Sequence, residues 1–380
     1  MSKANLGIQS VHSLELSVKD ARPWLEYLSG GFGFQLIAAS TGSDVEQTGQ
    51  RRRYLRCGDA GLVLAEQMQG GSAVHRYLRR HPEGISRVNF LVQDIDRTEQ
   101  TLLERHATPT GPIETAQVGD GRWRSFSIAT PLDDVEFCFI QSSDRRGLVM
   151  PGMEPAGHFD PNQNPLGLLG FDHFTANMRT LMPTVAFFEH VLGFRRFWDV
   201  QFHTEGLRPG VGTGLKSIVM WDEESGIKVA NNEPLRPRFS ESQVQLCVEA
   251  NRGPGIHHFA FEVNDVLQAV DHAHRRGLQF LAIPDAYYAA LPGRITVQGI
   301  KGVSQSIDDL QSRGILLDGD KSGYLLQAFC KNRSDRFARA DAGPLCMELI
   351  QRSGATGFGE GNFRALFEAM TRQQDESANT

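Results

Sequence analysis

Residues 252–263 read Arg-Gly-Pro-Gly-Ile-His-His-Phe-Ala-Phe-Glu-Val and predict a turn that leads directly into a β-strand. Proline restricts φ and glycine allows positive φ, so Gly-Pro-Gly is typical of a turn. Side chains alternate between the faces of a strand, so His258 and Glu262 should share one face and His257 should lie on the other. A stiff strand that holds an imidazole near its start suits a metal centre. A lone His-His pair is nevertheless more often a core histidine beside a solvated one.

Length and composition indicate a soluble globular protein. At about 150 residues per domain, 380 residues suggest two or three domains. A net charge of -6, with a longest basic cluster of only Arg51-Arg52-Arg53, favours neither nucleic acid nor an anionic membrane as a partner. The five cysteines lack CxxC spacing, which argues against a disulfide framework or structural zinc. Without a signal peptide or an apolar run of membrane-span length, we expect a cytoplasmic protein.

The chain contains two copies of one unit, one in each half. Each half begins with a strand that carries a histidine near its start, then a helical pattern and a Gly-Phe pair. A second strand and helix follow, and each half ends in a strand that contains Ile-Gln. The matched segments are 11–16 with His12, 21–28, 82–92, 94–105 and 135–141 in the first half, and 170–175 with His173, 181–191, 254–263, 265–276 and 346–351 in the second. This repetition predicts an α+β protein with two curved sheets, each closing around a cavity.

Residues 151–166 are rich in proline, glycine and asparagine and are interpreted as a linker. We therefore expect an N-terminal domain at 1–160 and a C-terminal domain at 161–380.

Aligning the two halves isolates three residues with metal-binding chemistry. Where the first half has His12, Arg87 and Cys138, the second has His173, His258 and Glu348. Two histidines and one carboxylate, with the remaining positions open, are the ligand set of non-heme Fe(II) oxygen-activating enzymes, although zinc uses the same donors. His173 alone could be a polar residue at a strand edge. Glu348 is harder to explain that way, because a carboxylate in an apolar strand is costly unless it is paired or metal-bound.

The second half of the chain resembles the 4-hydroxyphenylpyruvate dioxygenase family of the vicinal oxygen chelate superfamily. The resemblance is strongest over residues 170–372 and mainly architectural before them. The motifs that carry it, in order, are 191–194 (VLGF), 202–205 (FHTE), 232–234 (NEP), 242–245 (SQVQ), 286–288 (AYY), 324–327 (YLLQ), 348–352 (ELIQR) and 357–363 (GFGEGNF). It implies a vicinal oxygen chelate fold, in which paired βαβββ modules form open, barrel-like sheets. The first domain would lack a metal site.

The resemblance also implies the cofactor, the substrate and the residues of the site. Fe(II) would be held by His173, His258 and Glu348, and would act on an α-keto acid and O₂. The expected product from 4-hydroxyphenylpyruvate is homogentisate with CO₂, as in tyrosine catabolism, and the enzyme is expected to be a homodimer or homotetramer. The residues that match the substrate pocket are Ser217, Asn232, Gln243 and Gln327, the aromatic walls Phe329, Phe358 and Phe363, and also Asn362 and His257. Residues 357–370 would form a helical segment that gates the pocket mouth.

Three departures from the family pattern leave the substrate and the oxidised carbon open. His257 stands where the family has glutamine, Cys346 where it has an aromatic residue, and Ala230-Asn231 precede the Asn-Glu-Pro motif. We expect His257 to make activity depend on pH between about 5 and 8, and Cys346 to face the cavity beside Glu348. Asn232 favours ring hydroxylation over the benzylic hydroxylation of the sister enzyme hydroxymandelate synthase. An oxygenase that acts on another arylpyruvate, or a binding protein of the superfamily that performs no chemistry, would also fit these residues.

Overall fold

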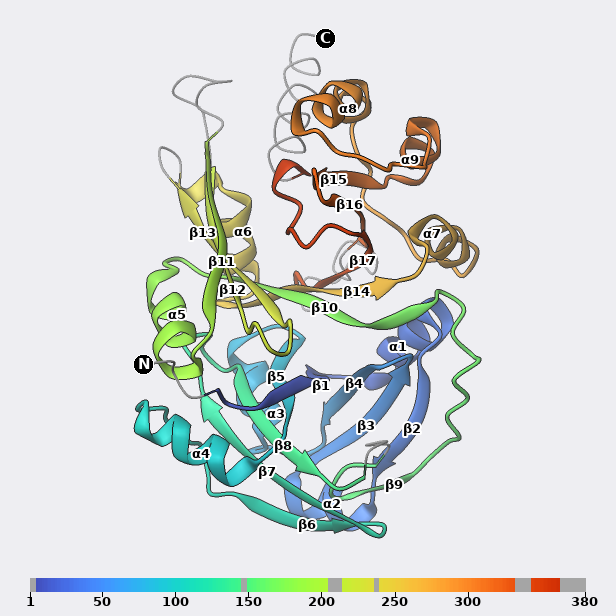
Figure 1. Ribbon diagram of the computed structural model, residues 1–380. Helices are drawn as coiled ribbons and strands as arrows, with labels where there is room; N and C mark the ends of the chain where they lie inside the picture. The colour runs from blue at the N-terminus through green and yellow to red at the C-terminus, as the bar shows by residue number, and fades with distance from the viewer. Residues whose placement is uncertain (1–4, 145–148, 204–213, 236–238, 332–342, 363–380) are drawn as a thin grey trace.

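Two curved sheets, one from each half of the chain, form the framework of the protein (Figure 1). The computed structural model describes residues 5–144, 149–203, 214–235, 239–331 and 343–362. Among them, the first sheet has the strand order β6-β7-β8-β5-β1-β4-β3-β2-β9 and the second has the order β11-β12-β13-β10-β14-β17-β16-β15. The two central strands of each sheet are antiparallel, β1 with β5 in the first and β10 with β14 in the second. Each central strand is parallel to its other neighbour.

The elements confirm the predicted paired βαβββ modules. The first half contains β1 (Ile8–Val18), α1 (Ala21–Leu25), the π-helical turn η1 (Glu26–Phe32), β2 (Gln35–Ser40), α2 (Gly42–Thr48), β3 (Gln50–Cys57), β4 (Ala60–Gln67), α3 (Ala73–Arg80), β5 (Gly84–Val92), α4 (Ile95–Glu104), β6 (Glu114–Val118), β7 (Gly121–Ala129), β8 (Glu136–Ser142) and β9 (Met153–Pro155). The second contains β10 (Leu168–Asn177), α5 (Met182–Phe187), the π-helical turn η2 (Phe188–Leu192), β11 (Arg195–His203), β12 (Gly214–Trp221), β13 (Lys228–Leu235), the 3₁₀ turn η3 (Phe239–Glu241), α6 (Gln243–Ala250), β14 (Gly255–Val263), α7 (Val266–Arg275), α8 (Asp285–Gln298), α9 (Ile307–Arg313), β15 (Leu316–Asp320), β16 (Gly323–Phe329) and β17 (Cys346–Ser353).

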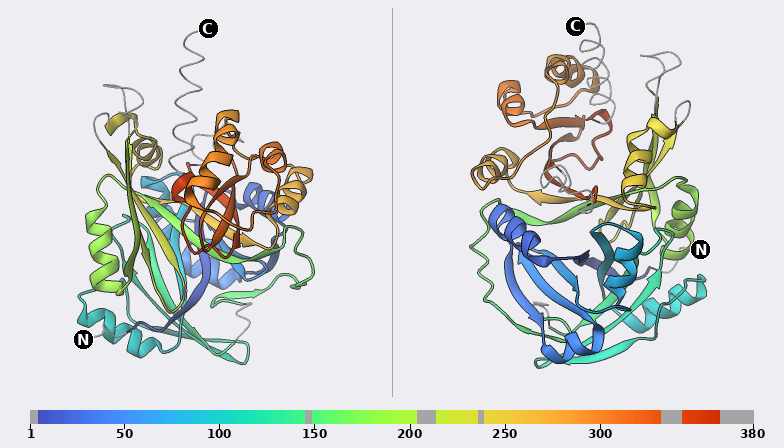
Figure 2. Two further views of the ribbon diagram at one scale, coloured as in Figure 1. Left: turned by 45° about the horizontal axis from the view of Figure 1, so that its top comes forward. Right: turned by 180° about the vertical axis from the view of Figure 1, so that it is seen from behind.

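Local sequence signals explain why the two halves have the same helices. Asp94 and Asp265 cap α4 and α7 with nearly identical backbone angles, and each side chain accepts a hydrogen bond from the first turn. Gly33 and Gly193 end the π-helical turns with φ of 85° and 81°, which accounts for the repeated Gly-Phe pair. The second half adds α8 and α9 between α7 and β15. In Figures 1 and 2 these orange helices lie on the side of the second sheet that faces away from the first half.

One apolar core extends through both halves. Phe137 of β8 lies 5.9 Å from Phe188, and Phe34 lies 5.6 Å from Phe261 of β14, measured between ring centroids. Residues 151–166 are less of a free linker than their composition indicates, because β9 pairs with β2 at the edge of the first sheet. We propose the predicted division near residue 160, which falls between β9 and the first strand of the second sheet. Among the described residues, no helix is long and apolar enough to cross a membrane.

Matching bulges in the central strand pairs define how the halves align. In the first half the residues without a partner opposite are Gln9, His12 and Ser86, and in the second they are Leu169, Asp172 and His257. The structural counterpart of His12 is therefore Asp172, and the counterpart of His173 is Ser13. The predicted match of His12 with His173 was wrong by one residue, whereas Arg87 with His258 and Cys138 with Glu348 are confirmed as equivalent positions.

Candidate metal centre

The three predicted metal ligands come from three adjacent strands and emerge on one face of the second sheet. Ala260 of β14 lies directly opposite His173 of β10 on one side and Glu348 of β17 on the other. His258 is two residues before Ala260 and therefore shares its face. Because the side chain of Ala260 is a single methyl group, it leaves room between the three donors.

The donor atoms converge on one point. His173 Nε2 lies 3.3 Å and His258 Nε2 lies 3.6 Å from the same carboxylate oxygen, Glu348 Oε2. All three side chains are buried, and Glu348 is 0% exposed. Within the described residues Glu348 Oε2 has no hydrogen-bond partner, a costly state for a buried carboxylate oxygen. A cation between the three atoms would satisfy this oxygen, so the residues fit a metal ion.

Protonation of the histidines reflects the same geometry. Burial alone would lower the pKa of His173, but the charge of Glu348 and the hydrogen bond to Asp172 outweigh it and raise the pKa to about 9. Burial lowers the pKa of His258 well below its ordinary value, and the neighbouring His257 and His173 lower it further. The same negative charge that raises the pKa of His173 would attract a cation between the donors, and metal binding requires the neutral form of His173.

Asp172 and Arg352 support His173 from behind, and sequence reasoning missed both. The bulge at Asp172 allows its Oδ1 to lie 2.7 Å from His173 Nδ1. Arg352 donates two hydrogen bonds to the same carboxylate, from Nε at 2.5 Å and from Nη2 at 2.7 Å. Burial would raise the pKa of Asp172, but the hydrogen bonds from Arg352 and His173 hold it well below its usual range. The carboxylate beside a histidine in an apolar strand was the available sequence signal.

Arg352 also fastens the chain segment that follows β17. Its Nη1 donates to the carbonyl oxygens of Ala355 at 3.1 Å and Gly357 at 2.7 Å. Lys228 Nζ donates to the Thr356 carbonyl at 2.8 Å. The segment that leads toward the predicted gate is therefore anchored to the same residue that supports a ligand.

Gln327 and Asn362 form a hydrogen-bond network that ends on Glu348. Gln327 Nε2 donates to Glu348 Oε1 at 2.9 Å, and Gln327 Oε1 accepts from Asn362 Nδ2 at 2.8 Å. Asn362 Oδ1 in turn accepts from the Tyr287 hydroxyl at 2.6 Å. Both residues were predicted to contact substrate. In this structure both ends of each amide are engaged within the protein, and the network connects Asn362 to Glu348. Contact of the two residues with substrate stays a prediction.

Ser217 and Asn232 lie directly opposite each other on β12 and β13. Both are buried, and neither Ser217 Oγ nor Asn232 Oδ1 has a hydrogen-bond partner among the described residues. Asn232 Nδ2 donates to Asn177 Oδ1 at 3.1 Å, which fixes the amide so that its oxygen remains an acceptor. The arrangement thus offers one free hydroxyl and one free carbonyl oxygen to a ligand.

The role predicted for Gln243, which the structure does not test, stays a prediction. Gln243 begins α6 and its side chain is exposed, whereas Gln245, two residues later, is buried. Gln245 Nε2 donates to Glu249, and Gln245 Oε1 has no partner among the described residues. Both glutamines belong to the motif Ser-Gln-Val-Gln, and their positions around α6 decide that Gln243 is exposed and Gln245 is buried.

Aromatic rings contact both histidines of the candidate metal centre. The Phe358 ring lies 4.4 Å from that of His173, and the Phe329 ring lies 5.7 Å from that of His258, measured between centroids. These apolar neighbours keep water from two sides of the centre. The third predicted aromatic, Phe363, lies outside the described residues, as does the rest of the predicted gate at 363–370.

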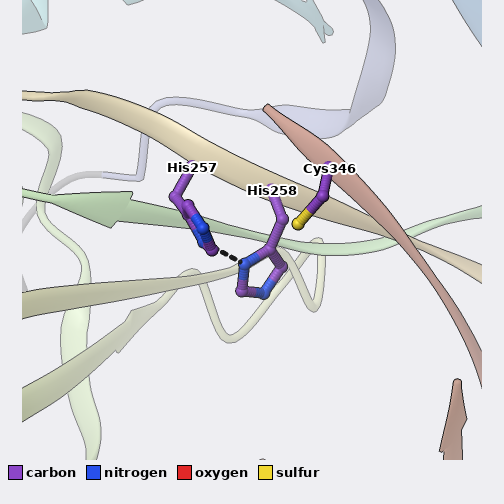
Figure 3. A group of neighbouring side chains, drawn as sticks. All are labelled: His257, His258 and Cys346. Atoms are coloured by element: carbon purple, nitrogen blue, oxygen red, sulfur yellow. Dashed lines mark hydrogen bonds between the residues drawn. The ribbon is translucent and has the colours of Figure 1, made fainter. Parts of the chain in front are cut away.

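His257 does not lie where strand alternation placed it (Figure 3). Thr175 pairs with His258 and Ala176 with Ile256, so His257 is the extra residue of a bulge. Its Nδ1 lies 2.8 Å from His258 Nδ1. Burial lowers the pKa of His257 to about 4, which moves its titration below the expected window of pH 5 to 8. Cys346 is buried beside His258, directly opposite it across β14 and β17.

Comparison with known proteins agrees with this architecture. Residues 170–292 match the glyoxalase/bleomycin resistance protein/dioxygenase superfamily. The chain is 34% identical to the 4-hydroxyphenylpyruvate dioxygenase of Danio rerio, over 97% of this chain and 91% of the relative, and 32% identical to that of Tetrahymena thermophila, over 98% and 91%. A solved mutant of 4-hydroxymandelate synthase from Streptomyces coelicolor superposes with a TM-score of 0.78 at 24% identity, covering 97% of this chain and 99% of that one. This chain, whose own second half carries the cluster of His173, His258 and Glu348, therefore belongs to the 4-hydroxyphenylpyruvate dioxygenase family.

Proposed function

We propose that this chain is an Fe(II)-dependent dioxygenase that converts 4-hydroxyphenylpyruvate and O₂ to homogentisate and CO₂. Its family membership implies a metal ion and a small-molecule substrate. The observation that supports iron is the convergence of two histidine Nε2 atoms and one carboxylate oxygen on a single buried point. Two histidines and one carboxylate are the donor set of non-heme Fe(II) oxygenases.

The charges around the site suit an anionic keto acid. When bound by His173, His258 and Glu348, Fe(II) would supply O₂ activation and Lewis-acid binding of the α-keto carboxylate. Glu348 contributes one negative charge, while Asp172 and Arg352 neutralise each other. A divalent ion would thus leave one net positive charge at the centre, which favours a carboxylate ligand over a neutral one.

Ser217 and Asn232 suit the other end of the substrate. Asn232 Oδ1 is held as an acceptor by the bond from Asn232 Nδ2 to Asn177, so it pairs with a hydroxyl that donates, such as a phenol. The hydroxyl of Ser217 can donate to or accept from the same group. Phe358 and Phe329 supply apolar walls, and exclusion of water strengthens the polar contacts inside.

The test is aerobic incubation of the Fe(II)-loaded protein with 4-hydroxyphenylpyruvate. Oxygen uptake is followed with an electrode, and the product is identified by mass spectrometry and NMR. We expect homogentisate, with iron binding and turnover both lost in Glu348→Ala. Formation of 4-hydroxymandelate would identify the benzylic hydroxylase, and an iron-loaded protein that binds the keto acid without consuming oxygen would identify a binding protein.

Asn232→Leu tests the orientation of the phenol. Loss of one hydrogen bond of about 1 kcal/mol should reduce the preference for 4-hydroxyphenylpyruvate over phenylpyruvate roughly fivefold in kcat/KM. Phenylpyruvate, which lacks the hydroxyl, serves as the internal control for general damage. An unchanged ratio would contradict the contact between Asn232 and the phenol.

A further inference from the structure

His257 and His258 are hydrogen-bonded to each other through their Nδ1 atoms, an arrangement that the bulge in β14 creates. The two atoms lie 2.8 Å apart, and the ring planes are inclined at 77° (Figure 3). Without the bulge, adjacent residues of a strand would point to opposite faces. The bulged backbone instead brings the ring of His257 against the side of His258 that faces away from Glu348.

The number of protons in this contact is fixed by geometry. Two bare nitrogens, or two N–H groups, would repel each other at this distance, so one Nδ1 donates and the other accepts. His258 Nε2 faces Glu348 Oε2 at 3.6 Å and must offer a lone pair to a metal there. A neutral His258 then carries its proton on Nδ1 and donates it, and His257 accepts on Nδ1 and carries its own proton on Nε2.

We propose that His257 is a positioning residue that fixes the tautomer and ring orientation of His258 as a metal ligand. This inference rests on the proposed metal site. A metal-bound histidine usually donates its other N–H to a carboxylate, a carbonyl or water, and loss of that partner typically costs about 10- to 100-fold in metal affinity. Here a second imidazole takes that place, and a flip of the His258 ring would exchange an N–H for a C–H and break the contact.

The two histidine ligands thereby have partners of different charge. His173 donates to the carboxylate of Asp172, whose charge Arg352 balances. His258 donates to an uncharged ring, so the orientation of the second ligand is secured without a further negative charge. A second carboxylate at position 257 would cancel the net positive charge that favours an anionic substrate. This difference explains why a neutral acceptor suits the position.

The first experiment needs no variant. Zinc uses the same donors and is diamagnetic, so uniformly ¹⁵N-labelled, zinc-loaded protein reports histidine tautomers through long-range ¹H–¹⁵N correlations. We expect His258 with its proton on Nδ1 and zinc on Nε2, and His257 with its proton on Nε2. A proton on His258 Nε2, or a proton on His257 Nδ1, would overturn the inference whatever the variants do.

The second experiment measures zinc affinity by chelator competition in His257→Leu, His257→Gln and His190→Leu. His257→Leu has no acceptor and should bind zinc about 10- to 100-fold more weakly. His257→Gln retains an amide oxygen that can accept and should recover most of the affinity. His190 is exposed, so His190→Leu controls for the loss of a histidine as such. Wild-type affinity in a folded His257→Leu would refute the positioning role.

A competing use of the same atoms is distinguishable. The ligand atoms of His257, His258 and Cys346 also lie within 4.8 Å of one another, so they could bind a soft cation themselves. Cobalt-loaded protein would then show a thiolate charge-transfer band that Cys346→Ser abolishes, and this result would overturn the inference. If the wild-type protein binds no metal, or binds it as tightly as Glu348→Ala does, the proposed function fails instead.

Discussion

Replacing Asp172 by asparagine should weaken the folded state and metal binding together. The substitution keeps the shape of the side chain and an oxygen that can accept from His173, but it removes the negative charge that pairs with Arg352. Both partners are largely buried, with side-chain exposures of 6% for Asp172 and 14% for Arg352. An unpaired guanidinium would therefore remain inside the protein.

The magnitude follows from these contacts. Breaking a buried ion pair from one side costs about 3–5 kcal/mol. Arg352 keeps its hydrogen bonds to the carbonyls of Ala355 and Gly357, so we expect a loss near the lower limit, about 3 kcal/mol. The amide oxygen can still accept from His173, but it lacks the negative charge of the carboxylate, so we expect a separate weakening of metal binding of about tenfold, the lower end of the usual range for such partners.

Urea unfolding of the metal-free proteins, followed by circular dichroism, measures the first effect, and chelator competition measures the second. Asp59→Asn is the matched control, because Asp59 pairs with Arg56 at 2.9 Å with 84% of its side chain exposed. An exposed pair contributes only about 0–1 kcal/mol. An Asp172→Asn protein that unfolds like wild type would refute the buried ion pair. Lower stability with wild-type metal affinity would refute the support of His173.

Two further substitutions probe the connection between Glu348 and the segment after β17. Gln327→Leu removes the donor to Glu348 and the acceptor for Asn362, so we expect weaker metal binding, by about tenfold, together with faster proteolysis near residue 362. Gly359→Ala should lower Tm, because φ is 80° there and a Cβ would overlap Gln327 Oε1. Wild-type Tm in that variant would mean that the segment is not seated on Gln327.

The three candidate ligands, whose role stays a prediction, could be selected from the sequence because strand alternation fixes which residues share a face. Glu348 was marked by its apolar neighbours, and His258 by the turn before its strand. Once the Ile-Gln pairs aligned the final strands, the comparison with Arg87 and Cys138 identified the correct positions. The pairing of β14 with β17, and of β5 with β8, has no bulge, so the alignment read from the sequence holds there.

The contacts that Asp172 and His257 make with the candidate ligands could not be predicted, because they depend on single-residue bulges, even though the composition around Asp172 was a signal. A bulge changes which face the following residues occupy, and nothing in one sequence marks Asp172 or His257 as the unpaired residue. Because the bulges were not foreseen, His12 was aligned with His173, whereas its structural counterpart is Asp172. The orientation of the Gln327 amide was equally hidden, since it depends on contacts with Glu348 and Asn362 from distant segments. The homodimer or homotetramer stays a prediction, which light scattering can check.

Within the part of the chain that the structure describes, the candidate metal centre lies in the second half alone, although both sheets have the same bulges. The first sheet has them at equivalent places, at His12 and Ser86, so the backbone that presents three donors exists in both halves. What differs is chemistry at three side chains, where Ser13, Arg87 and Cys138 replace two imidazoles and a carboxylate. Arg87 fills the first-half position with its own positive charge, paired to Glu136 at 2.8 Å. With the proposed metal bound, equivalent strands of both sheets would therefore carry a cation, as the Arg87 side chain in the first and as an ion held by His258 in the second, and only the ion leaves coordination positions open to substrate.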